Sequence, residues 1–134
     1  MKIKIYNPKD LNKKYRISVH RTGRMGFPAD AAEKLNLAEN KSADFGENED
    51  DPNDPNLYMV IYKEKEKGGF KVNKNGEYYS INLKILLDNL NINYSNGTVW
   101  FEMEEKIINE EKIYSLEKKG KVAKKNNEVE TVKE

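Results

Sequence analysis

Residues 15–37 read YRISVHRTGRMGFPADAAEKLNL, and this stretch decides the fold. Residues 15–19 alternate apolar and polar side chains, which is the pattern of a strand with one buried face. A tight glycine turn follows at residues 21–24, and residues 25–27 form a second, short extended piece. A proline, which suits the first helical position, then opens a short helix over residues 28–37. The stretch therefore predicts a β-hairpin followed by a helix.

The same order of features returns at residues 70–92, FKVNKNGEYYSINLKILLDNLNI. A strand leads into a turn over residues 73–76, where Asn-Gly is a strong hairpin signal. A second strand follows, and Ser80 is placed to cap a helix. The helix carries leucines at i, i+3, i+4 and i+7, which is an amphipathic pattern: Leu83, Leu86, Leu87 and Leu90.

Matching positions indicate that the chain is an internal repeat. Gly76 follows Gly23 by 53 positions, and the two helices end in Leu-Asn-Leu and Leu-Asn-Ile, 55 positions apart. Phe45 aligns with Trp100, and the strand at 57–60 aligns with 113–116. Each unit is then strand, turn, strand, helix, strand, loop, strand. Since about 50 residues bury too little apolar surface to fold alone, we expect the two units to pack their apolar faces together about a pseudo-two-fold axis.

The predicted fold class is α+β: a small, mostly antiparallel β-barrel or pair of sheets built from an internal duplication, with two short helices. Residues 1–14 are predicted as an N-terminal strand and turn, because Lys and Ile alternate from Lys2 to Tyr6. Residues 15–67 are the first β-hairpin/helix repeat and residues 68–117 the second. The segment 118–134 has almost no apolar residues and is predicted to be a disordered tail.

The composition excludes several kinds of site. The chain has no cysteine and one histidine among 134 residues, which excludes disulfides, thiol catalysis, thiolate metal sites and a His-rich metal site. No acid/base pair, activated nucleophile or phosphate loop is visible, so we expect neither an enzyme nor a cofactor. With 24 basic and 23 acidic residues the net charge is +1, so only the local placement of charge indicates a partner.

The N-terminus lacks the apolar run of a signal peptide, and no run approaches the ~20 apolar residues of a membrane span. We therefore expect a cytoplasmic protein that does not bind membranes, as a monomer or a homodimer.

The motif GRMGFP at residues 23–28, followed by a helix ending in EKLNL, resembles the AbrB-type swapped-hairpin domain. That family is marked by a glycine–basic pair, a short strand ending in proline, a short helix ending in a leucine pair, and two closing strands. Two such units, usually from two chains, interlock into one small β-barrel. The resemblance implies transcription regulators and antitoxins that bind duplex DNA through basic hairpin residues. The second unit departs from this pattern, with Glu77 where the first has Arg24.

Basic residues gather around the first hairpin and, less densely, around the second. Alternation places Arg16 and His20 on the polar strand face, where they would meet phosphates. Arg21 and Arg24 flank the turn and would reach a groove edge of duplex DNA. An ordinary solvated strand face explains the same pattern. The predicted nucleic-acid-binding residues are Lys13, Lys14, Arg16, His20, Arg21, Arg24, Lys71 and Lys74.

Two alternatives remain open beside duplex-DNA binding in a regulatory role. The acidic loop 47–54 would serve a non-enzymatic protein-interaction module, although a solvated loop explains it as well. Aromatic residues of the second half would stack unpaired bases in a single-stranded nucleic-acid binder, although their strand spacing also fits a core. These aromatic residues are Tyr78, Tyr79, Tyr94, Trp100 and Phe101.

Overall fold

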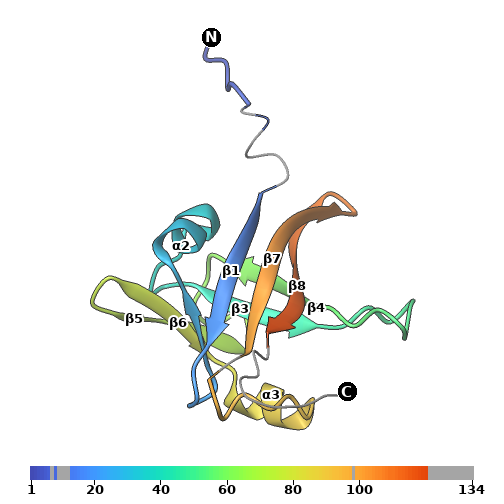
Figure 1. Ribbon diagram of the computed structural model, residues 1–134. Helices are drawn as coiled ribbons and strands as arrows, with labels where there is room; N and C mark the ends of the chain where they lie inside the picture. The colour runs from blue at the N-terminus through green and yellow to red at the C-terminus, as the bar shows by residue number, and fades with distance from the viewer. Residues whose placement is uncertain (7, 9–12, 98, 121–134) are drawn as a thin grey trace.

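The computed structural model describes residues 1–6, 8, 13–97 and 99–120, which form an eight-stranded antiparallel β-barrel with two short helices (Figure 1). The predicted small antiparallel barrel with two short helices is confirmed. In chain order the elements are β1 (Lys14–Val19), β2 (Arg24–Phe27), α2 (Ala29–Leu35), β3 (Ser42–Gly46), β4 (Leu57–Tyr62), β5 (Phe70–Asn75), β6 (Tyr78–Asn82), α3 (Lys84–Asn89), β7 (Val99–Ile108) and β8 (Glu111–Gly120). Neither of these helices is long and apolar enough to cross a membrane.

The two halves of the chain exchange their hairpins. Around the barrel the strand order is β1-β2-β6-β5-β3-β4-β8-β7, and β7 pairs back with β1. Among the described strands, β1–β2 and β3–β4 pair within the first half, and β5–β6 and β7–β8 within the second. The other pairs, β2–β6, β3–β5, β4–β8 and β1–β7, all join one half to the other. If each strand of the first half is replaced by its counterpart in the second half, β1 by β5 through β4 by β8 and the reverse, every pair of neighbours becomes another pair of neighbours. The strand order therefore has two-fold symmetry.

Both helices end in the same way. Asn36 and Asn91 take left-handed φ angles of 53° and 58°, a conformation that asparagine tolerates after a helix. The next amide in each unit, Leu37 N or Ile92 N, donates to a carbonyl five residues earlier at 3.0 Å. The two helix ends, 55 positions apart in sequence, therefore share one capping geometry.

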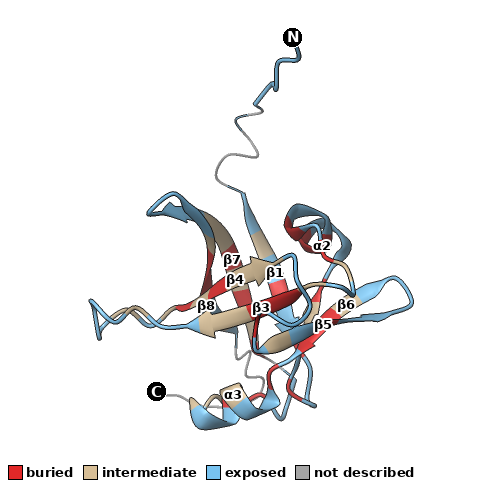
Figure 2. Cartoon of the chain, turned by 180° about the vertical axis from the view of Figure 1, so that it is seen from behind, coloured by how far each residue is buried: buried red, intermediate tan, exposed pale blue. Residues whose placement is uncertain are grey.

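Residues of both halves build the core inside the barrel. Figure 2 shows buried residues in the middle of the barrel strands and along α2. Ile17 and Met25 from the first half, and Ile81 and Phe101 from the second, are at most 1% exposed. Burying a side chain of this size contributes about 1.5–3 kcal/mol. Because each half supplies part of one core, neither half has a complete core of its own.

The predicted N-terminal strand from Lys2 to Tyr6 is wrong. These residues form no strand, and Ile3 and Ile5 are 71% and 82% exposed. In the closed barrel every described strand already has two neighbours. No free sheet edge is left there for a further strand to pair with, although the alternation of Lys and Ile would suit one.

The predicted helix cap at Ser80 is also wrong. Ser80 lies inside β6, and Leu83 is the N-cap residue without a side-chain cap bond. The neighbouring Asn82 instead accepts a hydrogen bond from Lys84 N at 3.0 Å through its Oδ1. The difference begins at the hairpin turn, which comprises Gly76 and Glu77 rather than residues 73–76. Consequently β5 continues to Asn75 and β6 occupies the positions expected for the cap.

The last two strands are longer than the strands that the sequence predicts over residues 98–103 and 112–116. Each has ten residues, and they meet at Asn109 and Glu110, whose φ angles are 52° and 67°. Two successive positive φ angles suit a two-residue hairpin turn whose twist matches the strands. Since β8 extends to Gly120, the first three residues of the predicted tail belong to the barrel. The remainder, 121–134, lies outside the described residues.

Candidate nucleic-acid interface

The turn between β1 and β2 is held tightly against the second half of the chain. His20 N donates to Arg24 O and Gly23 N donates to His20 O, both at 2.9 Å. Gly23 has a φ of +86°, and its carbonyl accepts a hydrogen bond from Leu83 N at 2.9 Å. A Cβ at Gly23 would lie 2.7 Å from Lys84 Cα, so only glycine allows this close approach. The arginines of the turn are therefore presented from a fixed backbone.

Three of the eight predicted basic residues lie beside carboxylates. The Nζ to carboxylate oxygen distances are 4.0 Å for Lys13 with Asp30, 3.8 Å for Lys14 with Glu102, and 3.1 Å for Lys71 with Glu66. Exposed pairs of this kind are weak, but each carboxylate offsets the local positive field of its lysine. These three residues therefore contribute less to anion binding than their number suggests.

Two further predicted residues lie over aromatic rings. The guanidinium of Arg16 lies 4.1 Å from the centroid of the Trp100 ring, and Lys74 Nζ lies 5.8 Å from that of Tyr79. A guanidinium that lies over the face of a ring can still donate N–H groups to a phosphate. The stack thus orients Arg16 without consuming its hydrogen-bond donors.

The remaining three predicted residues are His20, Arg21 and Arg24. Within the described part of the chain, none of their side chains forms a hydrogen bond or an ion pair. Arg21 lies against Gly97, where an added Cβ would be 3.4 Å from its Cγ and Nε. Two arginines of one turn are therefore free to bind an anion.

A carboxylate borders the same hollow as Arg21 but has other partners. Asp88 accepts hydrogen bonds from Lys84 Nζ at 2.9 Å and from Tyr94 OH at 2.8 Å. The bond from Lys84, followed by that from Tyr94, lowers the pKa of Asp88, and the bond to Asp88 is the main cause that raises the pKa of Lys84. Asp88 is thus ionised and held by Lys84 rather than by Arg21.

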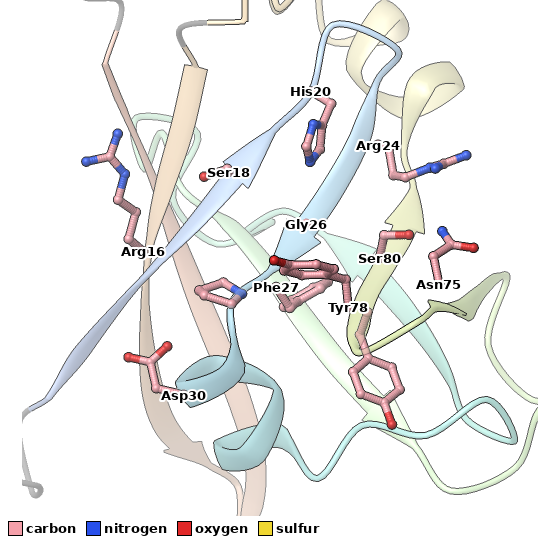
Figure 3. A pocket seen from close by; sticks show the side chains of 12 residues that line it. Arg16, Ser18, His20, Arg24, Gly26, Phe27, Asp30, Asn75, Tyr78 and Ser80 are labelled. Carbon is pink, nitrogen blue, oxygen red and sulfur yellow. The ribbon is translucent and has the colours of Figure 1, made fainter.

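A groove of about 780 Å³ runs over the outer face of β1, β2 and β6 to the end of β5. Figure 3 shows the side chains around it, with His20 and Tyr78 reaching toward Gly26 from opposite sides. The second half of the chain contributes Tyr78 and Tyr79, two of the aromatic residues predicted for single-stranded nucleic-acid binding. The polar and aromatic side chains lining the groove are Arg16, Ser18, His20, Arg24, Phe27, Asp30, Asn75, Tyr78, Tyr79 and Ser80. Among the described lining residues Lys71 and Lys74 do not occur.

The predicted aromatic residues divide between the groove and the core. Tyr78 is 73% exposed and lines the groove, whereas Tyr94 and Phe101 are 7% and 1% exposed and belong to the core. Tyr79 is half-buried in the groove wall, and Trp100 lies under Arg16. Only part of the set is therefore available to stack on a ligand.

Sequence reasoning missed Ser80 as a site residue. It lies opposite Gly26 in the β2–β6 pair, is 5% exposed, and has an Oγ without a hydrogen-bond partner among the described residues. Gly26 has no side chain, and the His20 imidazole lies over it, so that a Cβ there would be 3.0 Å from His20 Nε2. The only signal in the sequence is a serine between Tyr79 and Ile81, and its position before the leucine helix favours a helix cap instead.

The acidic loop 47–54 forms hydrogen bonds within itself and with the residues that follow it. Asp54 accepts from Asn48 Nδ2 at 3.1 Å, from Asn56 N at 2.9 Å and from the hydroxyl of Tyr58. The bond from Tyr58 is the main cause that lowers the pKa of Asp54. Across the described residues, His, Asp and Glu side chains nowhere gather in a group of three suited to a metal ion. A protein partner for this loop stays a prediction.

Protein-family models, curated proteins and solved structures give no match to this chain. The small antiparallel barrel is therefore established from its strand pairing alone. A function can therefore be inferred only from the side chains of the hairpin turn and of the groove beside it.

Proposed function

We propose that this chain binds nucleic acid through the face of β1, β2 and β6, with phosphates contacting the turn between β1 and β2. The observation that carries this proposal is the pair Arg21 and Arg24, exposed in the first turn and at the start of β2, without an ionic partner among the described residues. Arg16, oriented by Trp100, lies on the same face. A guanidinium matches a phosphate in shape and charge, and such a field acts over about 8–10 Å at physiological salt.

The resemblance to the AbrB-type swapped-hairpin domain adds duplex DNA and a regulatory role to this proposal. The exchange of hairpins between the halves supports it, because β1 pairs with β7 and β5 pairs with β3. One chain would then supply both units that the family usually draws from two chains.

The two hairpin turns differ, and this difference bears on the target. The first turn spans residues 21–23 and precedes Arg24, whereas the second consists of Gly76 and Glu77. A duplex would therefore meet one basic turn and one acidic turn. Since palindromic sites are read by two equal halves, we expect a non-palindromic target and one chain per site.

Replacing both turn arginines, Arg21→Ala with Arg24→Ala, is expected to weaken binding and to reduce its dependence on salt. Each lost phosphate contact lowers the slope of log K against log salt by about 0.9 for duplex DNA and about 0.7 for a single strand. The double substitution should therefore reduce the slope by roughly 1.4 to 1.8. Fluorescence anisotropy with labelled duplex and single-stranded oligonucleotides at several salt concentrations measures both quantities.

The matched control is Lys63→Ala with Lys65→Ala, which removes two exposed positive charges from the connector between β4 and β5. It should leave the salt slope near the unsubstituted value. Equal losses in the two double variants would mean that net charge alone drives binding. Such a result, or the absence of binding to either oligonucleotide at low salt, would contradict the proposal.

A further inference from the structure

We infer that the groove over β2 and β6 holds one unstacked nucleobase from a single-stranded segment. The inference rests on the proposed function, in which the adjoining turn binds the backbone of the strand. It assigns a second task to the same face, namely the recognition of a base rather than of phosphates. Its evidence is separate from that for the arginines and comes mainly from the second half of the chain.

The first observation is the hydroxyl of Ser80 at the groove. The residue is 5% exposed, and its Oγ has no partner among the described residues. A buried hydroxyl left without a hydrogen bond is unfavourable, so such a group calls for a ligand or a water molecule. A hydroxyl both donates and accepts, and the edge of a nucleobase offers both kinds of partner.

The second observation is the aromatic ring beside it. Tyr78 is 73% exposed although its ring is largely apolar, and it borders the groove together with Phe27 and Pro28. A flat base can stack on such a ring whatever its identity, because every base has a π face. The groove thus combines an apolar wall with a few polar groups, as ligand sites usually do, and its volume of about 780 Å³ lies in the range of such sites.

The third observation is that Gly26, which has no side chain of its own, lies beneath the His20 imidazole. Any larger residue would place a Cβ 3.0 Å from His20 Nε2 and would fill the space between β1 and β6. Ser80, its partner in the β2–β6 pair, lines the same groove, and its Oγ is buried there. A flat group that enters at this point would displace the exposed imidazole of His20 and so reach the hydroxyl.

The charges around the groove suit a nucleotide within a strand. Arg16 and Arg24 line it, and its one carboxylate, Asp30, lies 4.0 Å from Lys13. Phosphates on either side of the base would meet these guanidinium groups. A base in a duplex is paired and stacked, and its edge cannot reach a recessed hydroxyl, so the ligand must be unpaired.

The test compares the affinities of full-length variants for labelled oligo-dT, oligo-dA and oligo-dC, for duplex DNA, and for unlabelled thymidine monophosphate as competitor. Tyr78→Ala should lower single-strand affinity about tenfold, whereas Tyr78→Phe keeps the ring and should restore it. Ser80→Ala should reduce the differences in affinity among the three homopolymers, because the hydroxyl reads the base edge. Tyr6→Ala removes an exposed tyrosine outside the groove and should change nothing. Circular dichroism confirms that each variant keeps the barrel.

The outcomes separate this inference from the proposed function. If Tyr78→Ala binds single strands as well as Tyr6→Ala does, while the arginine double variant binds weakly, the base site is wrong and the phosphate-binding turn stands. If Ser80→Ala leaves every homopolymer preference unchanged, water alone satisfies the hydroxyl and the assigned role of Ser80 is wrong. A competing mononucleotide that matches the oligonucleotide in affinity would make a free nucleotide the ligand and overturn the strand assignment. If no oligonucleotide binds, both proposals fail.

Discussion

Cutting the chain between Glu66 and Lys67 is expected to give two pieces of which neither folds as a monomer, while their mixture rebuilds the barrel. Within either half the two hairpins share no strand pairing, since all described links between hairpins run to the other half. An isolated two-stranded hairpin is marginal in water at best. The cut itself falls in an exposed connector and breaks no strand. Loss of structure would therefore come from the missing half and not from damage at the cut.

Circular dichroism and sedimentation of each piece, alone and mixed, measure this expectation. Mixing should restore the spectrum of the intact chain in a one-to-one complex, and the melting temperature of that complex should depend on concentration. A homodimer of one half would also agree with the fold, because its two copies could take the places of the two halves in the barrel. A monomeric half with a cooperative thermal transition would contradict the interlocked fold.

Truncating the side chain at the centre of the barrel is expected to give the largest loss of stability from a single substitution. Phe101 is 1% exposed and lies opposite Ile17 in the β1–β7 pair, which joins the two halves. Phe101→Ala removes a ring and leaves a cavity, which typically lowers the free energy of unfolding by about 3–5 kcal/mol. Since small domains are stable by about 5–15 kcal/mol in total, this is a large share.

Urea denaturation measures the loss, and Ile107→Ala provides the control on the same strand. Ile107 is 64% exposed, so its truncation should change the free energy of unfolding by no more than about 0.5 kcal/mol. If both substitutions have similar small effects, the interior of the barrel does not hold the halves together as described.

The sequence predicted those features of the fold that depend on residues close together along the chain. Alternation at residues 15–19, the leucine spacing from Leu83 to Leu90 and the turn glycines Gly23 and Gly76 each indicate local geometry. The repeat then led to the barrel, because two incomplete units require each other. The N-terminal strand failed for the opposite reason. Its alternation describes a suitable strand but not whether a sheet edge is free to accept it.

The basic part of the candidate site could be predicted, but the groove could not. Arg16 and Arg24 stand out by charge and alternation, whereas Ser80 acquires its position from pairing with Gly26, 54 positions earlier in the sequence. The second turn lies at Gly76 and Glu77, later than the sequence predicts, and this serine lies within β6 rather than at a helix cap. The partners of Lys13 and Lys14 are likewise set by packing, which no local pattern encodes.

Titrations of the isotope-labelled chain with a duplex and with a single-stranded oligonucleotide, followed by amide chemical shifts, test most directly whether this face binds nucleic acid. The largest shifts should fall on residues 20–26 and 78–80, which form the turn and the groove. Shifts confined to the acidic loop 47–54, or no shifts at low salt, would contradict the account.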